Sequence, residues 1–143
     1  MEDLILKMDM IKAYGRVNWT FLKLMLLQIG LTVDVVNWIM ECVESINYGV
    51  LINGSPINSF RGTRGVRQGF PLSPLLFLII IEGLSRLIVN SKDRGDIIGI
   101  KISTLIRITH LLFLDDVLIS GIAHVREWKN YKRILDIFVT PGE

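Results

Sequence analysis

Acidic residues follow two short apolar segments that lie far apart in the sequence. Asp9 ends the first segment, and Asp115 and Asp116 end the second. One carboxylate from a strand and two from a hairpin can hold a pair of divalent cations. Two such ions stabilise the charge that develops while a phosphoryl group is transferred. The chemistry that these residue types indicate is therefore metal-assisted phosphoryl transfer.

The elements that must position these acids can be predicted from local patterns. Short apolar runs between turn residues predict strands at 4–9, 48–52, 57–61, 97–102, 106–114 and 117–120. Longer periodic runs predict helices at 19–29, 32–45, 73–90 and 125–138. Asn53-Gly54 predicts a hairpin turn, and Ser73-Pro74 predicts an N-cap followed by a first helical turn. Strands mixed with packed helices make the fold class α+β, with an antiparallel sheet that carries the acidic hairpin.

The composition fits one domain with a high apolar content for a domain that stands alone. The 143 residues are half hydrophobic and carry a net charge of +2, and their mean hydropathy is +0.46. Such apolar content indicates faces that pack on a neighbour or on further polypeptide. With so small a net charge, nucleic-acid binding would need local basic clusters. The candidates are Arg61, Arg64 and Arg67, with Lys12 and Arg16. The single cysteine, Cys42, excludes an internal disulfide and is expected to be a small buried hydrophobe.

No targeting segment is expected from the sequence. Residues 2–8 mix charged and apolar side chains, and no signal-peptide core follows them. The longest apolar run, 75–81, is too short to span a bilayer, and we expect it to form the interior face of a buried helix. We therefore expect an intracellular protein with no membrane partner.

Three stretches, at residues 8–15, 64–74 and 113–116, resemble in that order the motifs of reverse transcriptases of the non-LTR, LINE type found in plant retroelements. The first motif of that family reads Leu-Asp-x-x-Lys-Ala-Tyr/Phe-Asp, and residues 8–15 read Met-Asp-Met-Ile-Lys-Ala-Tyr-Gly. The second reads Arg-Gly-x-Arg-Gln-Gly-Asp-Pro-Leu-Ser-Pro and is matched by residues 64–74, with Phe in place of Asp. The third, Phe-Ala-Asp-Asp, stands as Phe-Leu-Asp-Asp at 113–116. The resemblance implies a palm-like polymerase fold.

The resemblance also assigns roles to residues of this chain. It implies that Asp9, Asp115 and Asp116 bind two Mg²⁺ ions, for which Mn²⁺ can substitute. A nucleotide-binding set would comprise Ala13, Tyr14, Gln68 and Gly69, with the Tyr14 ring as the steric gate against ribonucleotides. Arg64 and Arg67 would contact nucleic-acid phosphates. Ordinary packing for Tyr14, an ordinary loop for Gln68 and Gly69, and solvated surface for the arginines are the alternatives.

Three departures and the extent of the chain qualify the expected activity. Gly15 and Phe70 replace acids of the family motifs, and Leu114 replaces a smaller residue. Residues 1–143 would be a partial reverse transcriptase domain, a palm whose natural packing partners, the fingers and thumb, are largely missing. The parent reaction would join deoxynucleotides to a DNA primer on an RNA template. The alternatives are an inactive retroelement remnant that binds nucleic acid weakly at most, and an unrelated α+β binding module with a chance acidic hairpin.

Overall fold

The main sheet is antiparallel and has β7 (Asp116–Ile122) as its central strand, between β1 (Asp3–Asp9) and β6 (His110–Phe113). This computed structural model describes residues 2–9, 14–67, 69–113 and 116–139. Strand β7 alternates in burial, because Val117 and Ile119 are buried while Asp116 and Leu118 are partly exposed. The sheet therefore has one face toward the core and one toward solvent.

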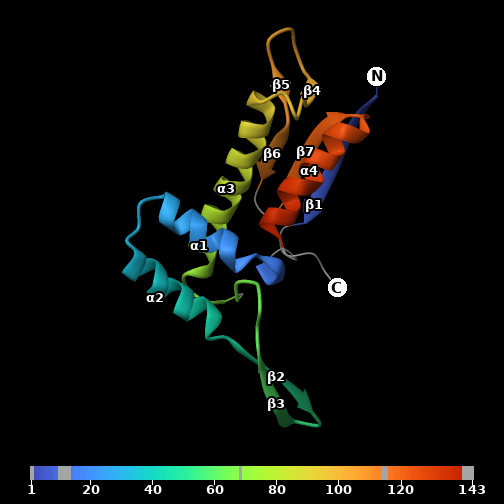
Figure 1. Cartoon of the computed structure of the whole chain (residues 1–143). Helices are drawn as coiled ribbons and strands as arrows, with labels where there is room; N and C mark the ends of the chain where they lie inside the picture. Colours follow the sequence, from blue (N-terminus) through green and yellow to red (C-terminus); the bar gives the residue numbers. More distant parts are fainter. Residues whose placement is uncertain (1, 10–13, 68, 114–115, 140–143) are drawn as a thin grey trace.

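The described residues form four α-helices. They are α1 (Trp19–Gln28), α2 (Val33–Glu44), α3 (Ser73–Asp93) and α4 (Val125–Phe138), preceded by the short 3₁₀ helix η1 (Tyr14–Arg16). Of these helices, α4 lies against the main sheet, whereas α1 and α2 lie farther from it, around one end of α3 (Figure 1). Helix α4 packs on β7, and α3 packs on both α4 and α1. Side-chain caps start three of them: Asn18 Oδ1 accepts from the amides of Thr20 and Phe21, Thr32 Oγ1 accepts from Val35, and His124 Nδ1 accepts from Arg126.

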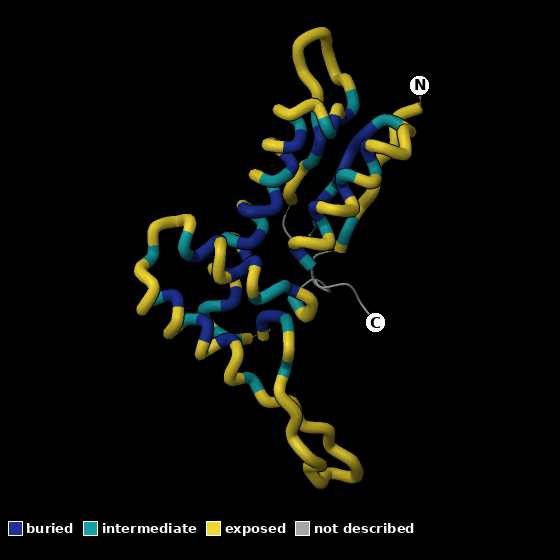
Figure 2. The backbone as a smooth tube through the Cα atoms, viewed as in Figure 1, coloured by how far each residue is buried: buried dark blue, intermediate teal, exposed yellow. Residues whose placement is uncertain are grey.

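A hairpin arm, β2 (Asn47–Ile52) and β3 (Ser55–Arg61), projects away from the helices (Figure 1). Its turn residues Asn53 and Gly54 both have positive φ, 52° and 78°, as the predicted Asn-Gly hairpin turn requires. Every residue of the two strands is exposed (Figure 2). The arm therefore packs on no other part of the described chain.

The strands predicted before the acidic hairpin are longer than the strands that form. Only β4 (Ile100–Lys101) forms within the predicted 97–102 strand, and the predicted 106–114 strand is divided into β5 (Arg107–Ile108) and β6. The first strand is shortened because the carboxylate of Glu127 accepts hydrogen bonds from the amides of Ile98 and Gly99. These amides are thus unavailable to a neighbouring strand.

Three further expectations are wrong in detail. Leu72 is the N-cap of α3, whereas Ser73 lies in the first turn and its hydroxyl donates to the Arg67 carbonyl over 2.5 Å. Cys42 is exposed on α2 rather than buried. The apolar run 75–81 does not lie wholly inside, because Leu75 and Leu78 are 54% and 65% exposed. A helix of this length presents only one stripe to its neighbours, so the other apolar residues remain in solvent.

Helix α3 is the one described helix that is long and apolar enough to cross a membrane. Its most apolar 18-residue window has a mean hydropathy of 1.6, and 39% of that window is buried within the fold. Leu76, Ile80, Leu84 and Ile88 are almost completely buried against the other helices. A core helix meets the same criteria of length and composition, so these criteria alone do not indicate a membrane span.

Candidate metal and nucleotide site

Asp9 and Asp116 lie directly opposite each other in the main sheet. Strand β1 ends at Asp9 and β7 begins at Asp116, and the antiparallel register makes these two residues Cα partners. Residues that are opposite in an antiparallel pair project from the same face of the sheet. On the other side of β7, Asp116 is paired with Phe113 of β6. The fold thus brings together two acids that are far apart in the sequence, as expected.

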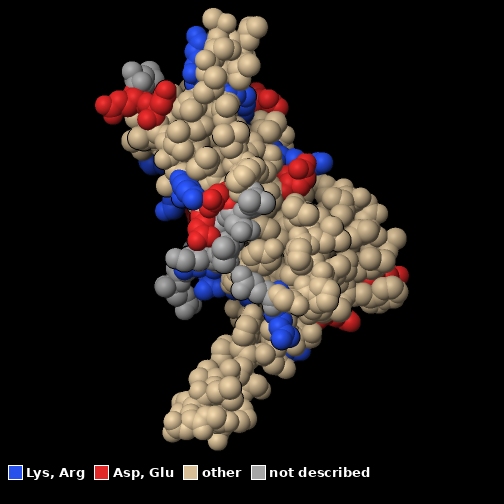
Figure 3. All heavy atoms as spheres, turned by 180° about the vertical axis from the view of Figure 1, so that it is seen from behind, with Lys and Arg blue, Asp and Glu red and all other residues tan. Residues whose placement is uncertain are grey.

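The face that carries these acids is the one turned away from the core. Val117, the neighbour of Asp116, is 1% exposed and points inward, so Asp116 points outward. Asp9 is exposed and Asp116 is of intermediate exposure. Figure 3 shows acidic and basic side chains side by side near the middle of this molecule, whereas the hairpin arm carries no charged side chain on the face seen. The carboxylates are therefore accessible to a ligand from solution.

Lys7 forms an ion pair with one of the two acids. Its Nζ lies 2.9 Å from Asp116 Oδ2. Lys7 and Asp9 are two residues apart on β1, so they share a face, and Lys7 reaches Asp116 diagonally across the strand pair. The hydrogen bond to Asp116 raises the pKa of Lys7, with further contributions from the charges of Asp116 and Asp9 that outweigh some loss of hydration. This lysine was not among the site residues predicted from the sequence.

The donor set suits a hard cation. Mg²⁺ is usually bound through one or two carboxylates, with water and substrate phosphates as its remaining ligands. Asp9 and Asp116 supply two carboxylates on one accessible face. Within the described ranges, no group of three or more His, Cys, Asp or Glu side chains is placed to hold a metal ion. Asp115, the third predicted ligand, lies outside the described residues, as does Leu114.

The Tyr14 ring stacks on Phe77 of α3. The ring centroids are 4.2 Å apart and the planes are inclined by only 14°. The backbone around Tyr14 is fixed by the segment that follows the hairpin arm: Val66 donates its amide to the Tyr14 carbonyl over 2.6 Å, and Gly65 donates to Val17 over 2.9 Å. The first and second predicted motifs are thus hydrogen-bonded to each other. The indole of Trp19 adds a bond to the Gly65 carbonyl, 2.8 Å long.

The remaining predicted residues are spread over the loop between β3 and α3. Arg67 and Gly69 are exposed, and Arg64 and Phe70 are partly buried. Gly69 has a φ of 82°, which favours glycine at this turn. Gln68 and Ala13, predicted to contact the nucleotide, lie outside the described residues. Phe70 leaves this loop without the acid that the family motif carries at that position.

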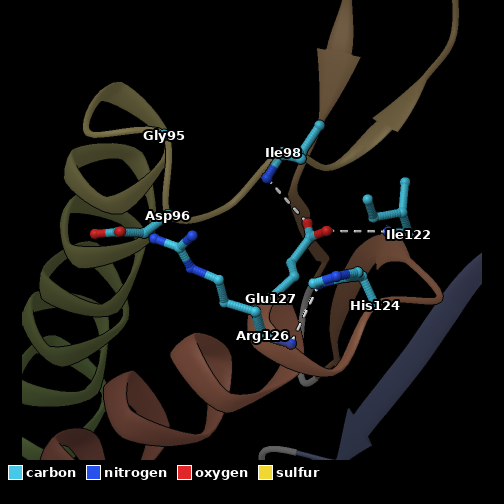
Figure 4. Close-up of a pocket in the computed structure, with 7 residues that line it drawn as sticks. All are labelled: Gly95, Asp96, Ile98, Ile122, His124, Arg126 and Glu127. Carbon is cyan, nitrogen blue, oxygen red and sulfur yellow. Dashed lines mark hydrogen bonds between the residues drawn. The ribbon is translucent and has the colours of Figure 1, made fainter.

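At the opposite end of the sheet, Glu127 organises a second polar cluster. Its Oε1 accepts from the amides of Ile98 and Gly99 over 3.0 and 2.8 Å, and its Oε2 accepts from Ile122 over 3.3 Å. The cluster borders a cavity of about 180 Å³, lined by Gly95, Asp96, Ile98, Ile122, His124, Arg126 and Glu127 (Figure 4). Glu127 is 2% exposed, and both of its carboxylate oxygens accept hydrogen bonds from backbone amides. Its role is to fix the loop before β4 onto α4.

His110 also has a structural environment. Its Nε2 lies 2.7 Å from the Ser85 hydroxyl, and its Nδ1 lies 3.0 Å from the Thr109 hydroxyl. Burial lowers the pKa of His110, and the positive charge of Lys92 lowers it further. The pairing of His110 with two hydroxyl groups joins β6 to α3. Nothing in this arrangement brings the imidazole to the acidic pair.

Comparison with solved structures shows the class of fold. The apo telomerase of Candida tropicalis, truncated from its C-terminal domain, superposes with a TM-score of 0.58 and 18% sequence identity, over 94% of this chain and 27% of that one. The chain therefore has a polymerase-like α+β fold. It also matches the reverse transcriptase (RNA-dependent DNA polymerase) family over residues 1–139, and it belongs to that family.

Two relatives share parts of their sequence with this chain. An uncharacterized mitochondrial protein of Arabidopsis thaliana is 46% identical over 67 residues, which are 46% of this chain and 55% of that protein. The retrovirus-related Pol polyprotein from type-1 retrotransposable element R2 of Popillia japonica is 25% identical over 115 residues, which are 80% of this chain and 18% of the polyprotein. The chain thus spans about half of the first relative and under a fifth of the second.

Proposed function

We propose that this chain carries the metal-binding centre of an RNA-directed DNA polymerase that adds deoxynucleotides to the 3′-hydroxyl of a DNA primer. The observation that carries this proposal is the register that sets Asp9 opposite Asp116. In a member of this family, two carboxylates on an accessible sheet face match the ligands of a divalent cation that also binds substrate phosphates. The protein would act within the cell on RNA template, primer and deoxynucleoside triphosphates.

Each of the predicted site residues would have a separate role in this reaction. Asp9, Asp115 and Asp116 would hold two Mg²⁺ ions, which activate the hydroxyl and stabilise the departing pyrophosphate when bound. Tyr14 would limit the space beside the sugar, and its stacking on Phe77 keeps the ring in a fixed orientation. Ala13, Gln68 and Gly69 would line the nucleotide, and the guanidinium groups of Arg64 and Arg67 would bind nucleic-acid phosphates. Phosphoryl transfer depends on such positioning more than on covalent chemistry by the protein.

We further propose that residues 1–143 form part of a larger catalytic domain. The Pol polyprotein that matches this chain is much longer, since only 18% of it is covered. Finger and thumb segments would cover the apolar surface that is exposed here, including Leu75 and Leu78 of α3. Without them, primer, template and triphosphate would not be aligned. We therefore expect the isolated chain not to extend primers.

A second candidate is a remnant that no longer catalyses and binds nucleic acid weakly at most. The departures at Gly15, Phe70 and Leu114 favour this candidate, because each changes a motif position of the family. Gly15 has no side chain to contribute a charge beside the site, and Phe70 presents a ring in place of a carboxylate. The two candidates differ in catalysis and share the metal site.

The decisive experiment separates metal binding from polymerisation. In thermal melts, about 5 mM Mg²⁺ together with about 5 mM dTTP should stabilise the chain by linkage. Asp9→Asn or Asp116→Asn should abolish this stabilisation. Primer extension on poly(rA)–oligo(dT), with Mg²⁺ or Mn²⁺, then tests catalysis. Extension that disappears in Asp116→Asn would establish a competent polymerase. Metal binding without extension would agree with both candidates, because we expect the isolated chain not to extend primers. Stabilisation that survives both substitutions would contradict the proposed metal site.

A further inference from the structure

Lys7 occupies the position in which a cation would approach the acidic pair. Its ammonium lies 2.9 Å from Asp116 Oδ2, on the sheet face that Asp9 and Asp116 share. An ammonium group is a compact point charge with no preferred geometry, in contrast to the planar fork of arginine. It therefore offers the carboxylate the same kind of interaction as a metal ion, with one positive charge instead of two.

The ion pair between Lys7 and Asp116 is exposed enough to break easily. The side chain of Lys7 is 64% exposed and that of Asp116 is 36% exposed. Exposed pairs of this kind are held weakly, because water screens the attraction and both side chains lose freedom. Across the strand pair, the register partner of Lys7 is Leu118, which offers the ammonium no second polar contact. Lys7 can thus leave Asp116 without disturbing the sheet.

The charge of Lys7 opposes the binding of a divalent ion to the acidic pair. Asp9 and Asp116 each carry a carboxylate, and the ammonium of Lys7 is paired with that of Asp116. A divalent cation that binds both carboxylates neutralises the pair, but it must first replace the ammonium and then tolerate it nearby. Both effects oppose metal binding, and both act over a distance at which charges in water still interact.

We propose that Lys7 is an internal counter-ion that a divalent cation must displace from Asp116, so that Lys7 sets the metal affinity of the site. This inference rests on the proposed function, since it assumes that the Asp9–Asp116 pair binds the metal. It adds a residue that tunes the site without being a ligand. In the metal-free protein, Lys7 holds Asp116 in place; in the metal-bound protein, its ammonium is released toward solvent.

The test is a Mn²⁺ titration of the full chain, followed by the electron paramagnetic resonance signal of the free ion. Lys7→Met should bind Mn²⁺ about three- to tenfold more tightly than the unsubstituted chain at low ionic strength. The gain should shrink in 0.5 M KCl, where screening is strong. Lys7→Arg, which keeps the charge, should not show the gain.

A matched control removes the same charge elsewhere. Lys101 is an exposed residue of β4, which pairs with β5 in a separate small sheet and lies away from the end of β1 at which Asp9 stands (Figure 1). Lys101→Met should leave the affinity for Mn²⁺ within about twofold, because this exposed charge is hydrated and makes no ion pair with Asp9 or Asp116 that would have to be broken. Circular dichroism should confirm that both variants fold.

The outcomes distinguish this inference from the proposed function. If Asp116→Asn abolishes Mn²⁺ binding while Lys7→Met binds like the unsubstituted chain, the metal site stands and the counter-ion role of Lys7 is wrong. An equal gain in Lys7→Met and Lys101→Met would also overturn it, because net charge alone would then account for the effect. If Asp116→Asn binds Mn²⁺ as well as the unsubstituted chain does, the metal site itself is wrong.

Discussion

The ring of Tyr14 lies nearly parallel to the ring of Phe77, with the two centroids 4.2 Å apart. Tyr14 precedes α1, whereas Phe77 belongs to the first half of α3 and is 5% exposed. The stack therefore joins the segment after Asp9 to the central helix of the core. Whatever Tyr14 contacts in solution, its ring plane is set by Phe77.

This stack should be measurable as a coupling between the two positions. We predict that Tyr14→Leu and Phe77→Leu, combined in a double-mutant cycle, show a coupling of about 0.5–1.5 kcal/mol in urea unfolding. Tyr48 and Phe60 on the hairpin arm provide the control, because they also stack, at 5.7 Å, but are 38% and 55% exposed. Their coupling should be smaller. Additive effects of the two substitutions at Tyr14 and Phe77 would mean that the stack contributes nothing.

Two neighbouring glycines should differ sharply in their tolerance of alanine. A Cβ atom on Gly65 would lie 2.8 Å from the Gly15 carbonyl, and Gly65 has a φ of 90°. A Cβ atom on Gly15 meets none of the described residues within 4 Å. We expect Gly65→Ala to lower the free energy of unfolding by about 1–3 kcal/mol. Gly15→Ala should change it by no more than about 1 kcal/mol in either direction.

Chemical denaturation of both variants checks this contrast, and each variant serves as the control for the other. Equal destabilisation would show that the contact between residues 15 and 65 is looser than described. The result also bears on the missing acid of the first motif. Since a Cβ atom at Gly15 meets none of the described atoms within 4 Å, we expect Gly15→Asp, which restores the acid of the family motif, to leave the fold in place.

Local signals in the sequence account for most of the fold. The Asn53-Gly54 turn, the helix end before Gly30 and the helix 125–138 were predictable because neighbouring residues determine them. The union of Asp9 with Asp116 was predicted from the family resemblance, since no local pattern specifies a strand register between distant segments. The roles proposed for Asp115, Ala13 and Gln68 remain predictions, because these residues lie outside the described part of the chain.

Long-range side-chain contacts explain what the sequence could not reveal. Glu127 stands in an amphipathic helix with no feature that marks it as buried, yet it accepts three backbone hydrogen bonds from two other segments. Because its carboxylate binds the amides of Ile98 and Gly99, β4 is shorter than the predicted strand 97–102. The ion pair of Lys7 could likewise not be predicted from local patterns, because its partner Asp116 is more than a hundred residues away in the sequence.

Replacing Glu127 should destabilise the protein strongly. Glu127→Ala would leave the amides of Ile98, Gly99 and Ile122 without their acceptor, at a cost of about 3 kcal/mol or more. Glu127→Gln should cost less, about 1–2 kcal/mol, because its carbonyl can still accept while its amide group faces another donor. Urea unfolding measures both. A surface substitution on the same helix, Lys129→Ala, should be nearly neutral, and equal effects of all three would contradict the buried role of Glu127.

The stability of the protein should fall as the pH drops below about 6.5, because of His110. Burial and the charge of Lys92 lower the pKa of His110 below its ordinary value near 6.5. Below pH 6.5 the unfolded chain therefore binds more protons at this residue than the folded chain does. Stability then rises with pH, and on acidification it is lost from about pH 6.5 down to the folded-state pKa, by at most about 1.4 kcal/mol per pH unit.

Urea unfolding at pH 7.5, 6.5 and 5.5 tests this dependence, with the two histidines of the chain as a matched pair. His110→Gln keeps a polar side chain between Ser85 and Thr109 but does not titrate, so its stability should fall less between pH 6.5 and 5.5 than that of the unsubstituted protein. His124 is the exposed N-cap of α4, where its Nδ1 accepts from the Arg126 amide. His124→Asn preserves an N-cap acceptor and should leave the pH dependence in place. A slope that persists in His110→Gln and disappears in His124→Asn would assign the pH dependence to His124 and contradict the prediction for the partly buried His110.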